Sequence, residues 1–147
     1  MPSTSLDHGL ASPEGPAADS SLPGLPWAVE LAGARSARPA LELYEGGILL
    51  DVVSSTPIAP QLVRGIRAAS LAGSQRALAW GRLPSAGADI AVEFSSRPGR
   101  RRAVTAAVIE ITAWAWLAVA DGRFDRVAVR SGGRCLQYKV PRSRRWG

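Results

Sequence analysis

The stretch WAWLAVADGRFDRVAVRSGGRCLQYKV, residues 114–140, decides the fold class. Three segments have the composition of strands: 114–119 is wholly apolar, and in 124–130 and 134–140 apolar residues recur at alternate positions, as they do in strands with one buried face. Asp121-Gly122 and Gly132-Gly133 separate these segments, and both dipeptides are favoured in two-residue hairpin turns. The pattern predicts an antiparallel meander of three strands.

The two turns also predict how the strands pair. Counting outward from Asp121-Gly122 places Trp116 opposite Val127, and counting from Gly132-Gly133 places Val127 opposite Tyr138. A slip by one residue would exchange the two faces of the sheet, so the agreement of both turns supports the register. The expected core face carries Trp114, Trp116, Val127, Val129, Leu136 and Tyr138. The expected solvent face carries Arg126, Ala128, Arg130, Cys135, Gln137 and Lys139.

A second hairpin is predicted upstream, over residues 41–53. Leu41–Tyr44 alternates, Gly46-Gly47 can form a tight turn, and Ile48–Val53 completes the pair. A simple turn places Leu43 opposite Leu50, Leu41 opposite Val52, and Glu42 opposite Asp51. Further strands are expected over 76–83, 89–95 and 103–111, with Ile90, Val92 and Phe94 on one face.

A helix is predicted over residues 57–72. Thr56 can cap it, with Pro57 in the first turn, or it can begin at Pro60. Leu62, Ile66 and Ala69 recur at helical spacing, and Gly73 suits the position after the helix. The fold expected from the sequence is therefore α+β. It is mainly antiparallel β, about seven strands in a curved sheet or a partly open barrel, with one helix.

The length of 147 residues fits a single domain. Residues 1–26 are rich in Ser, Pro, Gly and Ala, which predicts a disordered tail. Residues 27–140 are expected to form one globular domain, followed by a basic tail over 141–147. Residues 103–120 approach the length of a membrane helix, but their β-branched side chains favour strands, so no membrane insertion is expected. A single cysteine and the lack of a signal pattern predict a cytoplasmic protein.

Positive charge is concentrated in the C-terminal half. Through Ala59 two basic residues stand against seven acidic ones, a formal charge of −5, and from Pro60 onward sixteen stand against five, a formal charge of +11. Such a difference in charge between the two halves of a chain can indicate that the basic half binds polyanions. Seventeen of the eighteen basic residues are Arg, and this composition, with abundant Ala, Gly and Pro, also arises from GC-rich coding whatever the function.

The chain offers few groups for catalysis. His8 is the only histidine and lies in the predicted tail, so no histidine-based dyad is expected in the domain. Cys135 is interpreted as a small structural thiol. Glu110 interrupts an apolar strand and is the one acid–base candidate, although such a residue more often pairs with an Arg or sits at a sheet edge. No metal-ligand spacing is present, so a non-enzymatic protein without metal or cofactor is expected.

Three basic clusters are candidates for contact with a polyanion. They are the loop residues Arg97, Arg100, Arg101 and Arg102, the sheet-face residues Arg126, Arg130 and Lys139, and the tail residues Arg142, Arg144 and Arg145. Trp27 and Trp146 flank the domain and are candidate partner-binding anchors, whereas Trp80, Trp114 and Trp116 are expected in the core. The sequence therefore suggests a small basic binding protein that contacts nucleic acid or another acidic partner. The alternative is a protein–protein interaction module or a homo-oligomeric scaffold.

Overall fold

The computed structural model describes residues 21–33, 38–55, 63–70, 72–84, 88–96 and 102–143. This part of the chain contains eleven strands in three antiparallel sheets and no helix. Sheet A has the order β1-β2-β3 and comprises Trp27–Ala32, Ala40–Glu45 and Ile48–Ser54. Sheet B has the order β4-β5-β9-β8 and comprises Val63–Ala69, Gln75–Arg82, Ala115–Asp121 and Val108–Glu110. Sheet C has the order β11-β10-β6-β7 and comprises Arg134–Lys139, Arg126–Ser131, Ala91–Ser95 and Ala103–Ala106.

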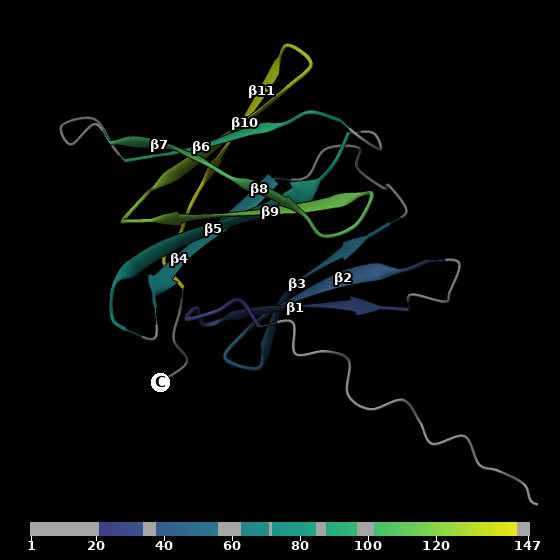
Figure 1. Cartoon of the computed structure of the whole chain (residues 1–147), viewed down its shortest axis with the longest axis horizontal. Coiled ribbons are helices and arrows are strands. Elements are labelled where there is room, and N and C mark those ends of the chain that lie inside the picture. The colour runs from purple at the N-terminus through teal and green to yellow at the C-terminus, as the bar shows by residue number, and fades with distance from the viewer. Residues whose placement is uncertain are drawn as a thin grey trace, which may run out of the picture.

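Sheet B is the middle layer, between sheets A and C (Figure 1). Its central strands contribute buried side chains to a core on each face. Successive side chains of a strand point to opposite faces, so β5 and β9 contribute to two cores at once. Ala79 and Trp116 pack in the core shared with sheet C, whereas Trp80 and Leu117 pack in the core shared with sheet A. Strands buried on both faces read as continuous apolar runs, which explains why residues 77–81 contain no charge.

Sheets B and C approach each other at both edges. On one side β7 continues into β8 with only Ala107 between them. On the other side the backbone N–H of Arg67 in β4 donates to the carbonyl of Pro141 (2.9 Å), and the N–H of Ser143 donates to the carbonyl of Arg67 (2.7 Å). The two sheets therefore form a sandwich with joined edges, and not a closed barrel.

The predicted helix over 57–72 is wrong where the structure describes it, because Val63–Ala69 forms strand β4. Gly65 packs against the Val140 side chain and the Leu78 carbonyl, a close approach that a strand beside β5 allows. Residues 56–62 and 71 lie outside the described part. Since the described residues contain no helix, the fold is all-β and the predicted α+β class is also wrong.

The predicted meander is half correct. The hairpin of β10 and β11 has the expected register, with Val129 opposite Leu136 and Val127 opposite Tyr138. β9, however, pairs with β5 and β8, so Asp121-Gly122 does not form a hairpin turn. The chain crosses here from sheet B to sheet C, and Phe124 enters the core after the crossing.

The side chains that were expected to share one core face lie in different places in the structure. Trp116, Val127 and Val129 share the core between sheets B and C. Trp114 packs against the other core, and Tyr138 is 41% exposed.

The first hairpin forms as expected, but its register differs by one residue. Leu43 lies opposite Asp51 and Leu41 lies opposite Val53, because a β-bulge interrupts the pairing after Leu43. The extra residue is Leu50, and a bulge of this kind changes which side chains face inward. Asp51 consequently does not lie opposite Glu42 as predicted.

Candidate cationic binding site

Two basic residues face each other on the outer face of sheet C. Arg126, the first residue of β10, lies directly opposite Lys139, the last residue of β11. Both side chains are exposed, and within the described part of the chain neither has an acidic partner. Like charges directly opposite each other destabilise a strand pair, so the fold itself gains nothing from this arrangement.

Arg130, the third predicted residue of this face, lies apart from the pair. It is four residues from Arg126 along β10, about 13 Å at the usual rise of a strand. Its guanidinium is 3.9 Å from the Glu93 carboxylate on β6, which partly compensates its charge. The structure therefore does not bring Arg130 together with Arg126 and Lys139.

A row of backbone hydrogen bonds crosses the end of sheet C beside Arg126 and Lys139. The N–H of Val140 donates to the Asp125 carbonyl, the N–H of Asp125 to the Ser95 carbonyl, and the N–H of Ser96 to the Arg102 carbonyl. This row brings Arg102, from the predicted loop cluster, to the same end of the sheet. Its guanidinium carbon lies 5.7 Å from the centre of the Phe124 ring, a cation–π contact that covers the end of the core.

Two further arginines lie at this end. Arg123 is exposed and stands in the chain between Gly122 and Phe124, the two residues that the guanidinium of Arg102 approaches. Sequence reasoning missed Arg123, because this residue stands between the predicted turn Asp121-Gly122 and the predicted strand that begins at residue 124. Arg142, from the predicted tail cluster, is exposed and bridges to Arg67 of β4. We call the group formed by Arg102, Arg123, Arg126, Lys139 and Arg142 the cationic end.

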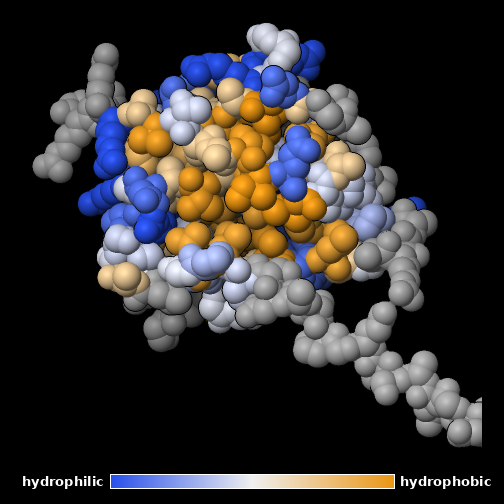
Figure 2. All heavy atoms as spheres, viewed as in Figure 1, coloured by the Kyte–Doolittle hydropathy of each residue, from blue (hydrophilic) through white to orange (hydrophobic). Residues whose placement is uncertain are grey.

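Two acids that flank the cationic end are already paired. The Asp125 carboxylate lies 3.3 Å from the Arg67 guanidinium, and Asp121 forms an ion pair with Arg76. These ion pairs neutralise residues of sheet B and leave the five cations of sheet C and its flanks uncompensated within the described part. Figure 2 shows hydrophilic residues gathered on the left, where β7 begins in Figure 1, and apolar surface over β8 and β9 in the middle.

Six of the predicted site residues lie outside the described part of the chain: Arg97, Arg100, Arg101, Arg144, Arg145 and Trp146. Trp27 is described, and the expectation that it is exposed is wrong. It is 1% exposed, and its indole Nε1 donates to the Glu45 carboxylate on the adjacent strand (3.0 Å). Trp27 is a core residue because β1 is a true strand whose alternate side chains face sheet B.

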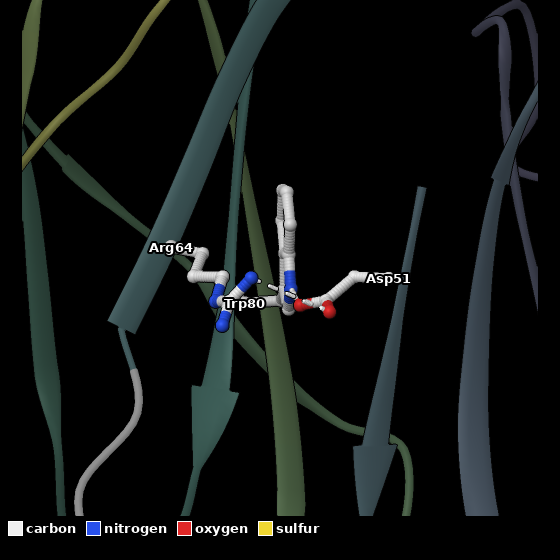
Figure 3. Close-up of polar contacts among 3 residues, drawn as sticks. All are labelled: Asp51, Arg64 and Trp80. Carbon is white, nitrogen blue, oxygen red and sulfur yellow. Dashed lines mark hydrogen bonds and ion pairs between the residues drawn. The ribbon is translucent and has the colours of Figure 1, made fainter. Parts of the chain in front are cut away.

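A polar contact between sheets A and B lies close to the core (Figure 3). The Trp80 Nε1 of β5 donates to the Asp51 carboxylate of β3 at 2.8 Å, and the Arg64 guanidinium of β4 lies 3.5 Å from the same carboxylate. The Asp51 side chain is 13% exposed, and each of its oxygens has a partner. The contact satisfies a buried donor and a nearly buried charge, so it is a structural link between two sheets.

The two reactive side chains considered from the sequence lie apart from the cationic end. Cys135 is exposed on β11, and Glu110 is exposed on the edge strand β8. Among the residues that the structure describes, no three His, Cys, Asp or Glu side chains gather as metal ligands would. In the same residues no helix has the length and apolar character needed to span a membrane.

Comparison with protein-family models, with curated protein sequences and with solved structures finds no match for this chain.

Proposed function

We propose that this protein is a non-enzymatic binding protein whose cationic end contacts a polyanion, with nucleic acid as the ligand class. The observation that carries the proposal is the exposed pair Arg126 and Lys139. The two residues lie directly opposite each other, and neither forms an ion pair with an acid among the described residues. A nucleic-acid backbone supplies closely spaced negative charge that would relieve this repulsion.

The identity of the cations supports the same ligand class. Four of the five residues are Arg, whose planar guanidinium can donate two parallel hydrogen bonds to one phosphate. The cations come from the ends of β10 and β11, the start of β7 and the two segments that connect sheets B and C. The pairing of β10 with β11 thus fixes the spacing of Arg126 and Lys139. The described residues include no pattern that reads bases, so we expect binding with little sequence preference.

A salt series tests the proposal. Fluorescence anisotropy of labelled single-stranded and duplex DNA is measured with the full chain at several salt concentrations. Arg126→Gln combined with Lys139→Gln should reduce the slope of log affinity against log salt by about two for duplex DNA. The matched control, Arg130→Gln with Arg134→Gln, removes the same charge from the other end of the hairpin and should leave the slope nearly unchanged. Binding without a salt slope, or equal slopes in both variants, would falsify the proposal.

Self-association is the second candidate function, and the outer face of sheet A favours it. Glu30 lies directly opposite Glu42, which lies opposite the exposed Val52. This acidic face and the outer face of sheet C lie on opposite outer layers, so a head-to-tail contact between two copies would join opposite charges. Light scattering over a range of concentrations measures it. A mass that stays monomeric for the native chain excludes this candidate, and a rising mass that Glu30→Gln with Glu42→Gln abolishes supports it.

A further inference from the structure

A pocket lies between sheets B and C, at the end of β10 remote from the cationic end. Its volume is about 330 Å³. Its walls come from both sheets and are mostly apolar, and they include Val63, Ile90, Trp116, Val129 and Leu136. Pockets that hold small molecules have volumes of about 300–1,000 Å³ and mostly apolar walls with a few polar groups. This pocket therefore suits a small ligand with an apolar body.

One cation at the pocket is available for a ligand. Arg134, the first residue of β11, lines the pocket and shares the inward side of its strand with Leu136. Its side chain is exposed and forms no ion pair or hydrogen bond with another described residue. Arg82 also lines the pocket, but its guanidinium donates to the carbonyl oxygens of Ser54 and Ser55. Arg82 is thereby engaged in holding the end of sheet A.

We propose that this pocket binds a small carboxylate with an apolar body, such as a medium-chain alkanoate. The alkyl chain lies between the sheets, and the carboxylate accepts hydrogen bonds from the Arg134 guanidinium. An Arg–carboxylate pair is bidentate and charge-assisted, so it fixes the orientation of the ligand at the mouth. The inference is independent of the proposed function, because Arg134 and the Arg126–Lys139 pair lie at opposite ends of the same hairpin.

Isothermal titration calorimetry of the full chain with octanoate tests this proposal. We expect saturable binding of one octanoate per chain. Octanol carries the same apolar body without the charge and should bind at least about tenfold more weakly, because it cannot form the charge-assisted bidentate pair with Arg134. Arg134→Gln should weaken octanoate binding to the same degree. The matched control is Arg130→Gln, which lies on the outer face of β10 and should bind octanoate as the native chain does.

A second variant fills the pocket and leaves Arg134 in place. Leu136→Trp should abolish octanoate binding while leaving DNA binding unchanged, with circular dichroism as the check on folding. If this variant does not fold, the comparison of Arg134→Gln with Arg130→Gln decides alone. The absence of saturable octanoate binding, equal affinity for octanol, or native affinity in Arg134→Gln overturns the proposal.

Discussion

The carboxylate of Asp51 shows how one residue connects two layers. It accepts a hydrogen bond from the indole of Trp80, which is 5% exposed, and it pairs with Arg64, whose side chain is 48% exposed. The two contacts contribute differently to the stability of the fold. An exposed ion pair contributes about 0–1 kcal/mol, whereas a buried donor left without a partner costs about 1–3 kcal/mol. The hydrogen bond to Trp80 is therefore the stronger link.

We predict that Asp51→Ala lowers the free energy of unfolding by about 1–3 kcal/mol, because it leaves the Trp80 N–H without an acceptor. Asp51→Asn keeps an acceptor oxygen at the same place and should cost less. Urea denaturation of the two variants measures the difference. The same loss in both variants would contradict the assignment, since it would mean that the charge and not the hydrogen bond matters.

Tyr44 is the residue whose titration the fold alters most clearly. Its hydroxyl donates to the Glu42 carboxylate, and this hydrogen bond, with burial and the negative charges of Glu42 and Glu30, raises the pKa of Tyr44 from 10.0 to about 12. A pKa raised by folding means that the folded state holds the proton more tightly. The stabilisation is present in full below pH 10 and is lost as the pH rises through about 12.

The tyrosinate absorbance of the folded protein tests this shift. In a Tyr138→Phe background, Tyr44 is the only remaining tyrosine, and its absorbance should rise near pH 12. Glu42→Gln removes the carboxylate that accepts the hydrogen bond and should move this rise to lower pH. A titration midpoint that Glu42→Gln leaves unchanged would argue against Glu42 as the cause.

At the scale of the elements, strand β4 depends on Gly65. A Cβ atom at this position would lie 3.0 Å from Val140 Cγ2 and 3.3 Å from the Leu78 carbonyl oxygen. We predict that Gly65→Ala lowers the free energy of unfolding by about 1–3 kcal/mol, the usual cost of overpacking. Thermal denaturation measures the loss. Val140→Ala should restore part of it in the double variant, and fully additive losses would show that Val140 is not the obstacle.

Local patterns predicted single hairpins and strands better than they predicted which strands pair. The β10–β11 hairpin, with Gly132 and Gly133 at positive φ, and the inward face of Val92 and Phe94 follow from alternation and turn chemistry, which act over a few residues. The partners of β9 follow from packing against β5, which is distant in sequence. Nothing near Asp121-Gly122 reveals that the chain crosses to another sheet there.

The bulge at Leu50 illustrates the same limit. A regular register would satisfy the pattern of residues 41–53 equally well. The bulge turns Asp51 toward Trp80 and Arg64, which belong to another sheet. The candidate site was only partly predictable for this reason. Alternation identified Arg126 and Lys139 as exposed, but only the tertiary arrangement pairs Arg130 with Glu93 and adds Arg123.

For the whole molecule, the double role of sheet B has a consequence for unfolding. Alternate residues of β5 and β9 belong to different cores. Detachment of sheet A would therefore expose Leu78, Trp80 and Leu117 to solvent. Detachment of sheet C would expose Trp116. Loss of either outer layer thus exposes one face of the same two strands, β5 and β9. Partly unfolded states are therefore disfavoured relative to the fully folded and the fully unfolded states.

We therefore predict a single cooperative unfolding transition for the described layers. Tryptophan fluorescence samples both cores, because Trp27 and Trp80 lie between sheets A and B with Trp114 packed against the same core, and Trp116 lies between sheets B and C. In urea denaturation, each of the variants Trp116→Phe and Trp27→Phe should give a fluorescence midpoint that coincides with its own midpoint by circular dichroism. An earlier fluorescence transition in Trp116→Phe, whose signal is dominated by the core of sheet A, would mean that sheet A detaches first. Sheets B and C would then form a stable unit without it, and the middle layer would not couple the two cores.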